Sequence, residues 1–297
     1  MPDQKVEGAT NEWTRQGTEP LTALQVRTPK QGYFDIAGDD ARLDWGYAYL
    51  VAPTTQAKAA IGGNSTLTSR FAADGALPTA PDLQSPRASN DNQPVIAMTF
   101  DLGTLTASPV SRHAMIGYDE VYAIKYFGQR LRPYWRRSGA TPSDLFQAAE
   151  RDYTSLNQRC IAFDRDLTID AAKTGGAKYA QMIALAYRQC LAGNGLAADS
   201  SGKPPLVTKE NTSNGDIATV EVICPQDPML ILLSPTLAKA SIVPVLAYGA
   251  SPSWKFPNAP HDLGTYPIAI GTDDGSEQMS VEESGNILII CDAIAKS

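Results

Sequence analysis

A long run of apolar residues at helical spacing constrains the fold of this chain more than any other feature. Over residues 145–171, apolar side chains recur every three or four positions, which is the period of one face of an α-helix. Thr141 can cap the start of this helix, and Gly175-Gly176 marks its end. A second helix is predicted over 177–192 after almost no loop. Two long helices joined by so short a turn predict an αα-hairpin.

The part of the chain before this hairpin has the period of β-strands. Alternation of apolar and polar residues predicts strands over 41–53, 95–102 and 114–127. In the last of these, the residues predicted to share one face are Ile116, Tyr118, Tyr122, Ile124 and Tyr126. Residues 54–94 are rich in Gly, Ser, Asn and Pro, and we interpret them as a long connection.

Two more helices are predicted after the hairpin, over 235–249 and 281–296. The helices are not separated by the alternating strands of a parallel α/β sheet, so a Rossmann fold is not expected. Strands followed by helices predict an α+β chain of two domains, with a β portion over 1–130 and a helical portion over 131–297. Hydrophobic residues make up 43% of the chain, which is enough to bury a core in each.

The charge of the chain argues against polyanionic partners. The net charge is −7, and basic residues form no run longer than Arg136-Arg137. Nucleic acid and anionic membrane surfaces attract basic patches, so neither is an expected partner. No segment approaches the roughly 18 consecutive apolar residues of a membrane span. A small molecule is the expected substrate.

The four cysteines, Cys160, Cys190, Cys224 and Cys291, have no spacing typical of a zinc site. We therefore predict no metal and no other cofactor. All but Cys224 lie in apolar helical patterns, where a buried, inert thiol is the expected state. Their even number leaves one or two disulfides open.

The candidate site lies in residues 254–286. This segment contains one of only two histidines together with several acidic and aromatic residues. Its Pro and Gly content is incompatible with a continuous helix before about Ser280. A loop with so many ionisable side chains just before an apolar helix is typical of a binding pocket.

Five sequence blocks in this order resemble the glutaminase A-type family of fungi and bacteria. They are Asp101-Leu102-Gly103; Tyr118-Asp119-Glu120 with residues 122–128; Ala186-Tyr187-Arg188-Gln189; Lys209-Glu210 with residues 213–216 and 219–222; and residues 261–267 with 281–286. The resemblance spans about residues 100–290, and an ordered set of blocks is more specific than one motif.

The resemblance implies the C-terminal part of a β-sandwich followed by the first hairpins of an (α/α) six-hairpin toroid. In that toroid, loops at one end of the ring form the active site. The helices predicted here fall short of a complete ring, so we expect the chain to be an internal fragment of a longer protein. The resemblance also implies a secreted or periplasmic protein, and residues 1–10 show no signal-peptide layout.

The activity implied by the resemblance is deamidation of L-glutamine to glutamate and ammonia. Amide hydrolysis needs a nucleophile or activated water. The chain has no G-x-S-x-G elbow and no S-x-x-K pair, so we predict a water activated by a carboxylate. Asp262 or Glu282 is the preferred base. Glu283 is a third catalytic candidate, although Ser280 and Glu283 also match a capping box.

Substrate-binding residues are predicted in the same blocks: Glu210, Asn214, Asp216, His261, Asn286 and Trp254. Structural roles compete with several of these assignments. His261 can bind a loop carbonyl, and Asn214-Gly215 is typical of a hairpin turn before a strand over 218–224. Trp254 can fasten its loop to the helices instead of contacting substrate.

Two other functions fit the same pattern. A six-hairpin glycoside hydrolase is the first, because an inverting enzyme needs two carboxyl groups roughly 6.5–9.5 Å apart around a water. A non-catalytic carbohydrate- or peptide-binding protein is the second. Ammonia release from L-glutamine distinguishes the glutaminase from both.

Overall fold

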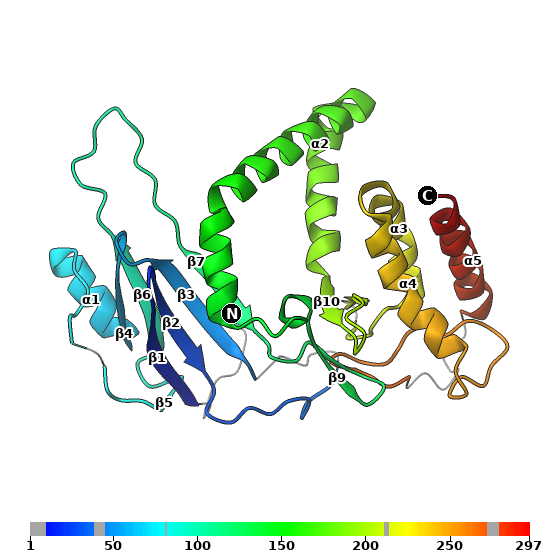
Figure 1. The fold of residues 1–297 in the computed structure, drawn as a ribbon, viewed down its shortest axis with the longest axis horizontal. Helices are drawn as coiled ribbons and strands as arrows, with labels where there is room; N and C mark the ends of the chain where they lie inside the picture. Colours follow the sequence, from blue (N-terminus) through cyan, green and yellow to red (C-terminus); the bar gives the residue numbers. More distant parts are fainter. Residues whose placement is uncertain (1–9, 39–44, 81, 211–213, 272–278) are drawn as a thin grey trace. The chain divides into compact units, whose positions relative to one another are not determined.

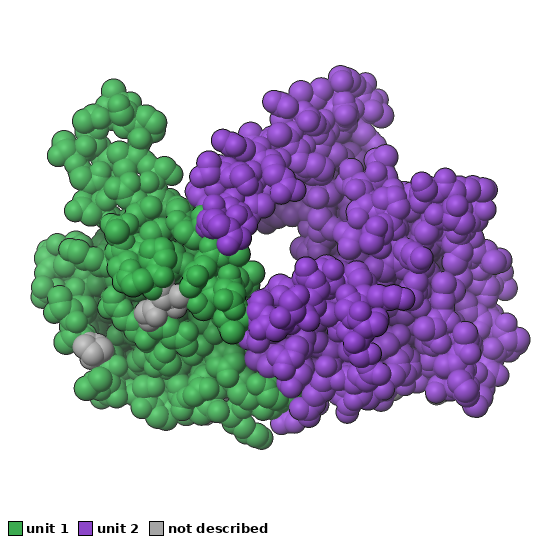
Figure 2. All heavy atoms as spheres, in the orientation of Figure 1, with its two compact units in different colours: residues 1–33, 43–120, 141–150 green, residues 34–42, 121–140, 151–297 purple. Residues whose placement is uncertain are grey.

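The computed structural model describes residues 10–38, 45–80, 82–210, 214–271 and 279–297 (Figure 1). Contacts between backbone segments divide the chain into two compact units (Figure 2). The first unit comprises Met1–Tyr33, Leu43–Glu120 and Thr141–Glu150, and the second comprises Phe34–Arg42, Val121–Ala140 and Arg151–Ser297. The predicted α+β class is confirmed, because both units contain sheets and five α-helices follow the strands or separate them.

The first unit contains an antiparallel sheet of five strands, in the order β5-β1-β2-β3-β7. Its strands are β1 (Thr10–Thr18), β2 (Leu21–Arg27), β3 (Tyr47–Pro53), β5 (Arg87–Ala88) and β7 (Met115–Asp119). Leu21, Ala23, Tyr49 and Val51 are buried on one face of this sheet. Phe146 packs on them, with its ring centroid 5.2 Å from that of Tyr49. The strand predicted over 41–53 is thus present as β3, which buries Tyr49 and Val51 on one face.

The predicted strand over 114–127 is wrong as a single element. It consists of β7 in the first unit and β8 (Ile124–Tyr126) in the second, separated by Val121 with a positive φ of 60°. The face of β7 that carries the apolar residue Ile116 is the outer one, because Ile116 is 89% exposed. Gly117, on the opposite face, lies so close to the Phe146 ring that a Cβ there would be 2.6 Å from it. The buried face of this strand carries Gly117 in place of a large apolar residue, so alternation of apolar residues does not identify this face.

Residues 54–94 are more ordered than the predicted long connection. They contain β4 (Ala57–Gly63), α1 (Asn64–Asp74) and β5, and β4 pairs with β6 (Pro94–Phe100) in a second, antiparallel sheet. Helix α1 ends at Gly75, which adopts the left-handed conformation and donates its N–H to Phe71. Strand β4 is mostly Ala and Gly, so it lacks the large apolar residues by which alternation is recognised.

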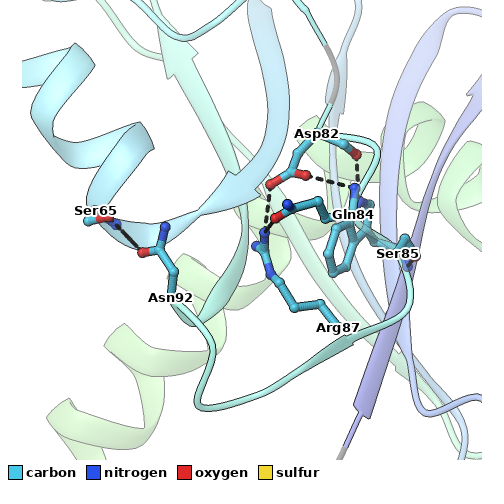
Figure 3. A network of polar contacts seen from close by, with 7 residues as sticks. Ser65, Asp82, Gln84, Ser85, Arg87 and Asn92 are labelled. Carbon is cyan, nitrogen blue, oxygen red and sulfur yellow. Dashed lines mark hydrogen bonds and ion pairs between the residues drawn. The ribbon is translucent and has the colours of Figure 1, made fainter.

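A polar network fastens the segment that follows α1 (Figure 3). The Arg87 guanidinium donates to Asp82 at 2.8 Å and lies 5.0 Å from the centroid of the Trp13 ring on β1. The Trp13 indole donates to the backbone carbonyl of Asp82. Asn92 accepts hydrogen bonds from the backbone and hydroxyl of Ser65 at the start of α1. These contacts tie the segment to both β1 and α1 without large apolar side chains.

The second unit combines a mixed sheet with a layer of helices. The sheet order is β11-β10-β9-β8-β12, and β12 is parallel to β8. Besides β8, the sheet contains β9 (Gln129–Pro133), β10 (Asn194–Ala198), β11 (Leu206–Thr208) and β12 (Ile268–Ala269). A 3-10 turn at Tyr134–Arg136 follows β9. Three helices, α3 (Val220–Leu233), α4 (Pro235–Gly249) and α5 (Ser280–Lys296), lie side by side in Figure 1. Their shared core includes Ile124, Leu131, Val220, Ile223, Ile242, Val245 and Ile290.

The predicted helical hairpin is confirmed as α2 (Pro142–Ala192), whose helical backbone is interrupted at Gly176 with φ 82°. The Thr141 hydroxyl accepts a hydrogen bond from the Asp144 N–H, and the Asp144 carboxylate accepts one from the Thr141 N–H. The Phe163 and Tyr187 rings, from the two arms, lie 5.2 Å apart. None of the helices in the described part of the chain combines the length and apolar character needed to cross a bilayer.

The cysteines differ from the prediction. All four are free thiols, so none of the possible disulfides is formed. Cys160 on α2 is exposed, whereas Cys190, Cys224 and Cys291 are partly buried. The apolar stripe that suggested burial of Cys160 has few packing partners in this region of α2, where Tyr153 and Leu156 are also exposed.

The predicted strand over 218–224 is wrong, because this segment enters helix α3. Ala218 has a positive φ of 56°, which turns the chain just before the helix. The run Val220, Val222 and Ile223 is β-branched and favours a strand locally. Burial of Val220, Ile223 and Leu230 in the core favours the helix, and α3 forms although Pro225 and Pro228 lie inside it.

Candidate functional site

The loop after α4 is held in register against the segment that leads into α3. Leu263 donates its backbone N–H to Ile217 at 2.9 Å, and Ile217 donates to Gly264 at 2.8 Å. Val220, the first residue of α3, donates to the carbonyl of His261 at 2.9 Å. This backbone pairing fixes His261 and Asp262 beside the start of α3, and both side chains are buried.

Asp262 orients the imidazole of His261. Its Oδ2 lies 2.8 Å from Nδ1 of His261, and its Oδ1 accepts a hydrogen bond from the N–H of Gly264. Gly264 has φ 107°, a conformation that glycine adopts far more readily than other residues. The carboxylate is therefore held at both oxygens, and the other ring nitrogen of His261, Nε2, faces helix α5.

Glu283 meets that nitrogen from α5. It is 1% exposed, and its Oε1 lies 4.0 Å from Nε2 of His261. Neither carboxylate oxygen has a hydrogen-bond partner within the described residues. Burial raises the pKa of Glu283 to about 7, and the carboxylates of Glu221 and Glu282 act in the same direction, whereas the interactions with His261 and with the amide of Asn286 oppose the shift. A carboxyl group with such a pKa exchanges a proton readily near neutral pH.

The capping box predicted at the start of α5 is wrong, and the two neighbouring glutamates lie in different environments. Met279 precedes α5 without a side-chain capping bond, so Ser280 and Glu283 do not form a capping box. Glu283 is buried beside His261, whereas Glu282, the preferred base, is exposed. Adjacent residues on a helix point about 100° apart, and α5 packs on the rest of the unit with the face that carries Glu283 and Ile290.

Glu210 and Asp216, both predicted to bind substrate, lie near this cluster. A Glu210 oxygen accepts a hydrogen bond from Thr219 at 3.2 Å. A carboxylate oxygen of Asp216 lies within 4.8 Å of ligand atoms of His261 and Asp262. Asn214 instead makes the turn, because its side-chain oxygen accepts the N–H of Asp216 at 2.9 Å. Residues 211–213 and 272–278, which lie in or between the blocks that contain these site residues, fall outside the described residues.

Trp254 fastens its loop to the helices. It is 8% exposed and lies in the core of the second unit, where its ring packs edge-on against Tyr248 of α4. Its indole N–H donates to the carbonyl of Asn258. The structural role considered for Trp254 is therefore the one observed, and a substrate contact is not supported. Asn286, a further predicted substrate-binding residue, is half-buried on α5 and lies close to Glu283, which is one turn before it.

Glu221 belongs to the cluster but was not predicted. It occupies the first turn of α3, and one of its oxygens lies within 4.8 Å of ligand atoms of His261 and Glu283. It lies in the block of residues 219–222, within the segment predicted to be a strand over 218–224. Recognition of a helix that begins at Val220 would have identified Glu221, because this helix directs Glu221 towards the loop that carries His261.

Comparison with protein families supports the resemblance seen in the sequence. Residues 176–297 match the glutaminase A six helical-hairpin domain, and residues 4–170, more than half of the chain, match a domain of unknown function, DUF5127. The chain belongs to the glutaminase A-type family. The six-hairpin match includes the second arm of α2 and helices α3 to α5, and therefore the whole His261 cluster.

Two curated fungal members of this family are similar to the chain. Glutaminase A of Aspergillus oryzae is 31% identical over 235 residues, which cover 76% of this chain and 33% of that protein. A probable glutaminase of Arthroderma benhamiae is 26% identical over 293 residues, which cover 94% of this chain and 33% of that protein. The chain thus spans about a third of the length of these relatives.

Proposed function

We propose that this chain forms part of the active site of a hydrolase that converts L-glutamine to glutamate and ammonia. Family membership and the names of the two relatives support an enzyme of this type. The observation that carries the proposal is the meeting of His261 and Asp262 with Glu283, from a loop and a helix, in one buried polar cluster. These residues belong to the blocks that resemble the family.

In this proposal, Glu283 and His261 activate the water that attacks the side-chain amide of glutamine. Asp262 is a positioning residue, because both of its oxygens are engaged by His261 and Gly264. Glu283 takes the role first assigned to Glu282, which is exposed. Glu210, Asp216 and Asn286 are proposed to hold the substrate, because they carry polar side chains near the cluster.

The test is ammonia release from L-glutamine by the full-length protein. Glu283→Gln is nearly isosteric, and we expect it to lower kcat by about 100-fold or more, the lower end of the usual contribution of a general acid or base. Glu282→Gln is the matched control, since it makes the same change on the neighbouring, exposed residue, and we expect kcat to stay within about twofold. Wild-type turnover in Glu283→Gln would remove Glu283 from the mechanism.

The two alternative functions have distinct outcomes in the same preparation. Release of reducing sugar from oligosaccharides without ammonia would favour a glycoside hydrolase. Binding of glutamine, a sugar or a peptide without turnover of any of them would favour a non-catalytic protein. Either result would contradict the proposed glutaminase activity while leaving family membership intact.

A further inference from the structure

We propose that Glu221, His261 and Glu283 form a binding site for one divalent transition-metal ion. One carboxylate oxygen from each glutamate and one imidazole nitrogen lie within 4.8 Å of one another. Imidazole nitrogen and carboxylate oxygen together are typical ligands of zinc, manganese and iron, whereas calcium and magnesium prefer oxygen alone. The three residues come from α3, a loop and α5, so no local sequence motif marks the site.

The state of Glu283 is an independent indication of a missing ligand. Its side chain is almost fully buried, it faces His261, and both of its oxygens are without hydrogen-bond partners within the described residues. A buried carboxylate normally has partners, because loss of hydration without compensation costs several kcal/mol. A bound cation would supply the missing interaction to one or both oxygens.

The arrangement around His261 is the one found at metal-binding histidines. Such a histidine usually donates its second ring N–H to a carboxylate, which fixes the tautomer and the ring orientation. Asp262 stands in that position, 2.8 Å from Nδ1, and directs Nε2 towards Glu283. Metal–ligand distances of about 2.0–2.2 Å place tetrahedral ligand atoms roughly 3.3 Å apart. The separation of 4.0 Å between Nε2 and Oε1 therefore needs only a small side-chain movement.

The local charges also favour a cation. The charged groups that act on the pKa of Glu283 are His261, Glu221 and Glu282, and no lysine or arginine of the described residues is among them. A divalent ion would offset the two carboxylates of Glu221 and Glu283. Asp216, His261 and Asp262 form a second close group, but Asp262 is already hydrogen-bonded to Nδ1. We therefore assign the ion to the Nε2 side of the imidazole.

The proposal goes beyond the proposed hydrolase activity and does not depend on it. Loss of ammonia release in Glu283→Gln is expected whether Glu283 is a base, a metal ligand or both. The test therefore measures metal binding directly. Full-length protein is stripped with a chelator and titrated with ZnCl2 by calorimetry, then with CoCl2 while the visible absorption of the cobalt ion is recorded. We expect one ion per chain for each metal, and weaker binding of CaCl2 and MgCl2.

Single substitutions locate the ion. We expect Glu283→Gln and Glu221→Gln each to weaken zinc binding by more than about 100-fold, and Asp262→Asn to weaken it by about 10–100-fold, as is usual for partners of a ligand. Glu282→Gln is the control for surface charge and should bind zinc within about twofold of wild type. His261→Asn should abolish the cobalt absorption bands. Circular dichroism checks that each variant is folded. If Glu283→Gln does not fold, Glu221→Gln provides the test, because Glu221 is only half-buried.

Several outcomes would overturn the site. They are the absence of stoichiometric zinc and cobalt binding, tighter binding of calcium than of zinc, and unchanged zinc affinity in both glutamate variants. Loss of binding in Asp216→Asn with wild-type affinity in Glu283→Gln would place the ion on the other side of His261. A protein that binds zinc as expected but releases no ammonia would keep the metal site and exclude the glutaminase activity. A protein that releases ammonia but binds no zinc would keep the glutaminase activity and exclude the metal site.

Discussion

At the scale of single residues, the second unit buries acidic groups in a way that couples stability to pH. Asp227 on α3 is 1% exposed, and among the residues that the structure describes only one of its carboxylate oxygens has a hydrogen-bond partner, the hydroxyl of Ser241 on α4. Burial raises the pKa of Asp227 from 3.8 to about 7, and the hydrogen bond from Ser241 opposes the shift. The folded protein therefore holds a proton that the unfolded chain releases near pH 4.

This difference predicts the sign of a pH effect. Between about pH 4 and pH 7 the folded state binds more protons at Asp227 than the unfolded state does, so the free energy of unfolding falls as pH rises. Asp227→Asn removes the titration, and we expect it to flatten this fall and to raise Tm relative to wild type at pH 8. The expected gain in the free energy of unfolding at pH 8 is on the order of 4 kcal/mol, because the pKa rises from 3.8 to about 7 and each pKa unit corresponds to about 1.4 kcal/mol. Chemical denaturation at pH 4, 6 and 8 measures it.

Asp292→Asn provides the control, because Asp292 is exposed on α5 and forms a surface ion pair with Lys296. We expect its free energy of unfolding to follow the wild-type pH dependence within a few tenths of a kcal/mol. An Asp227→Asn variant with the wild-type slope from pH 4 to pH 8 would show that Asp227 is ionised in the folded state.

Gly264 makes a second residue-scale prediction. Its φ of 107° is strained for any residue with a Cβ, and its N–H holds Asp262. We expect Gly264→Ala to lower the free energy of unfolding by about 1–3 kcal/mol. Gly285→Ala is the matched control, because a Cβ on Gly285 meets nothing within 4 Å and lies in helix α5. Alanine is the better helix former there, so Tm should stay equal or rise. Equal Tm values for both variants would contradict the strain at Gly264.

At the scale of elements, the ends of helices are determined by local hydrogen bonds. The hydroxyl of Thr141 accepts a hydrogen bond from the N–H of Asp144 at the start of α2, and the Asp144 carboxylate accepts one from the N–H of Thr141. Helix α5 begins without such a cap, although Ser280 and Glu283 have the spacing of one. The difference follows from packing, because Glu283 is buried against His261 and cannot reach back to the helix end.

This cap predicts opposite effects for two threonines of α2. Thr141→Ala removes the capping bond, and we expect a loss of about 1 kcal/mol in the free energy of unfolding. Thr168 lies within the same helix, where its hydroxyl donates to the Asp164 carbonyl. Thr168→Ala should leave stability unchanged or raise it, since alanine has the higher helix propensity. Thermal unfolding followed at 222 nm compares the two, and a loss at Thr168 equal to that at Thr141 would contradict the capping role.

At the scale of the whole molecule, the His261 cluster exists only because three distant segments meet. Glu221 begins α3, His261 and Asp262 follow α4, and Glu283 begins the last helix. The backbone bonds from Leu263 and Val220 join the first two segments, and the Ser284 hydroxyl accepts the N–H of Ala259 to join the loop to α5. The family match to the six-hairpin domain covers all three segments. The site is therefore a property of this domain and not of any single block.

Local periodicity was enough to identify most helices of the chain. The hairpin of α2, with its break at Gly176, and the helices α4 and α5 follow from apolar residues at a spacing of three and four. Such patterns report interactions between near neighbours in the sequence, and the same is true of the Asn214 turn and the Thr141 cap. The candidate site residues were predicted largely by resemblance, because the residues of a site have no periodic spacing along the sequence.

What the sequence by itself determined was the α+β class, the helical hairpin, the family and the segments from which the site is built. Only the tertiary structure decided that residues 220–223 are helical, that β7 buries its Gly117 face, and that Glu283 and not Glu282 faces His261. The physical reason is the same in each case. Neighbouring residues differ little in local preference, and burial against segments far away in the sequence selects which of them points inward.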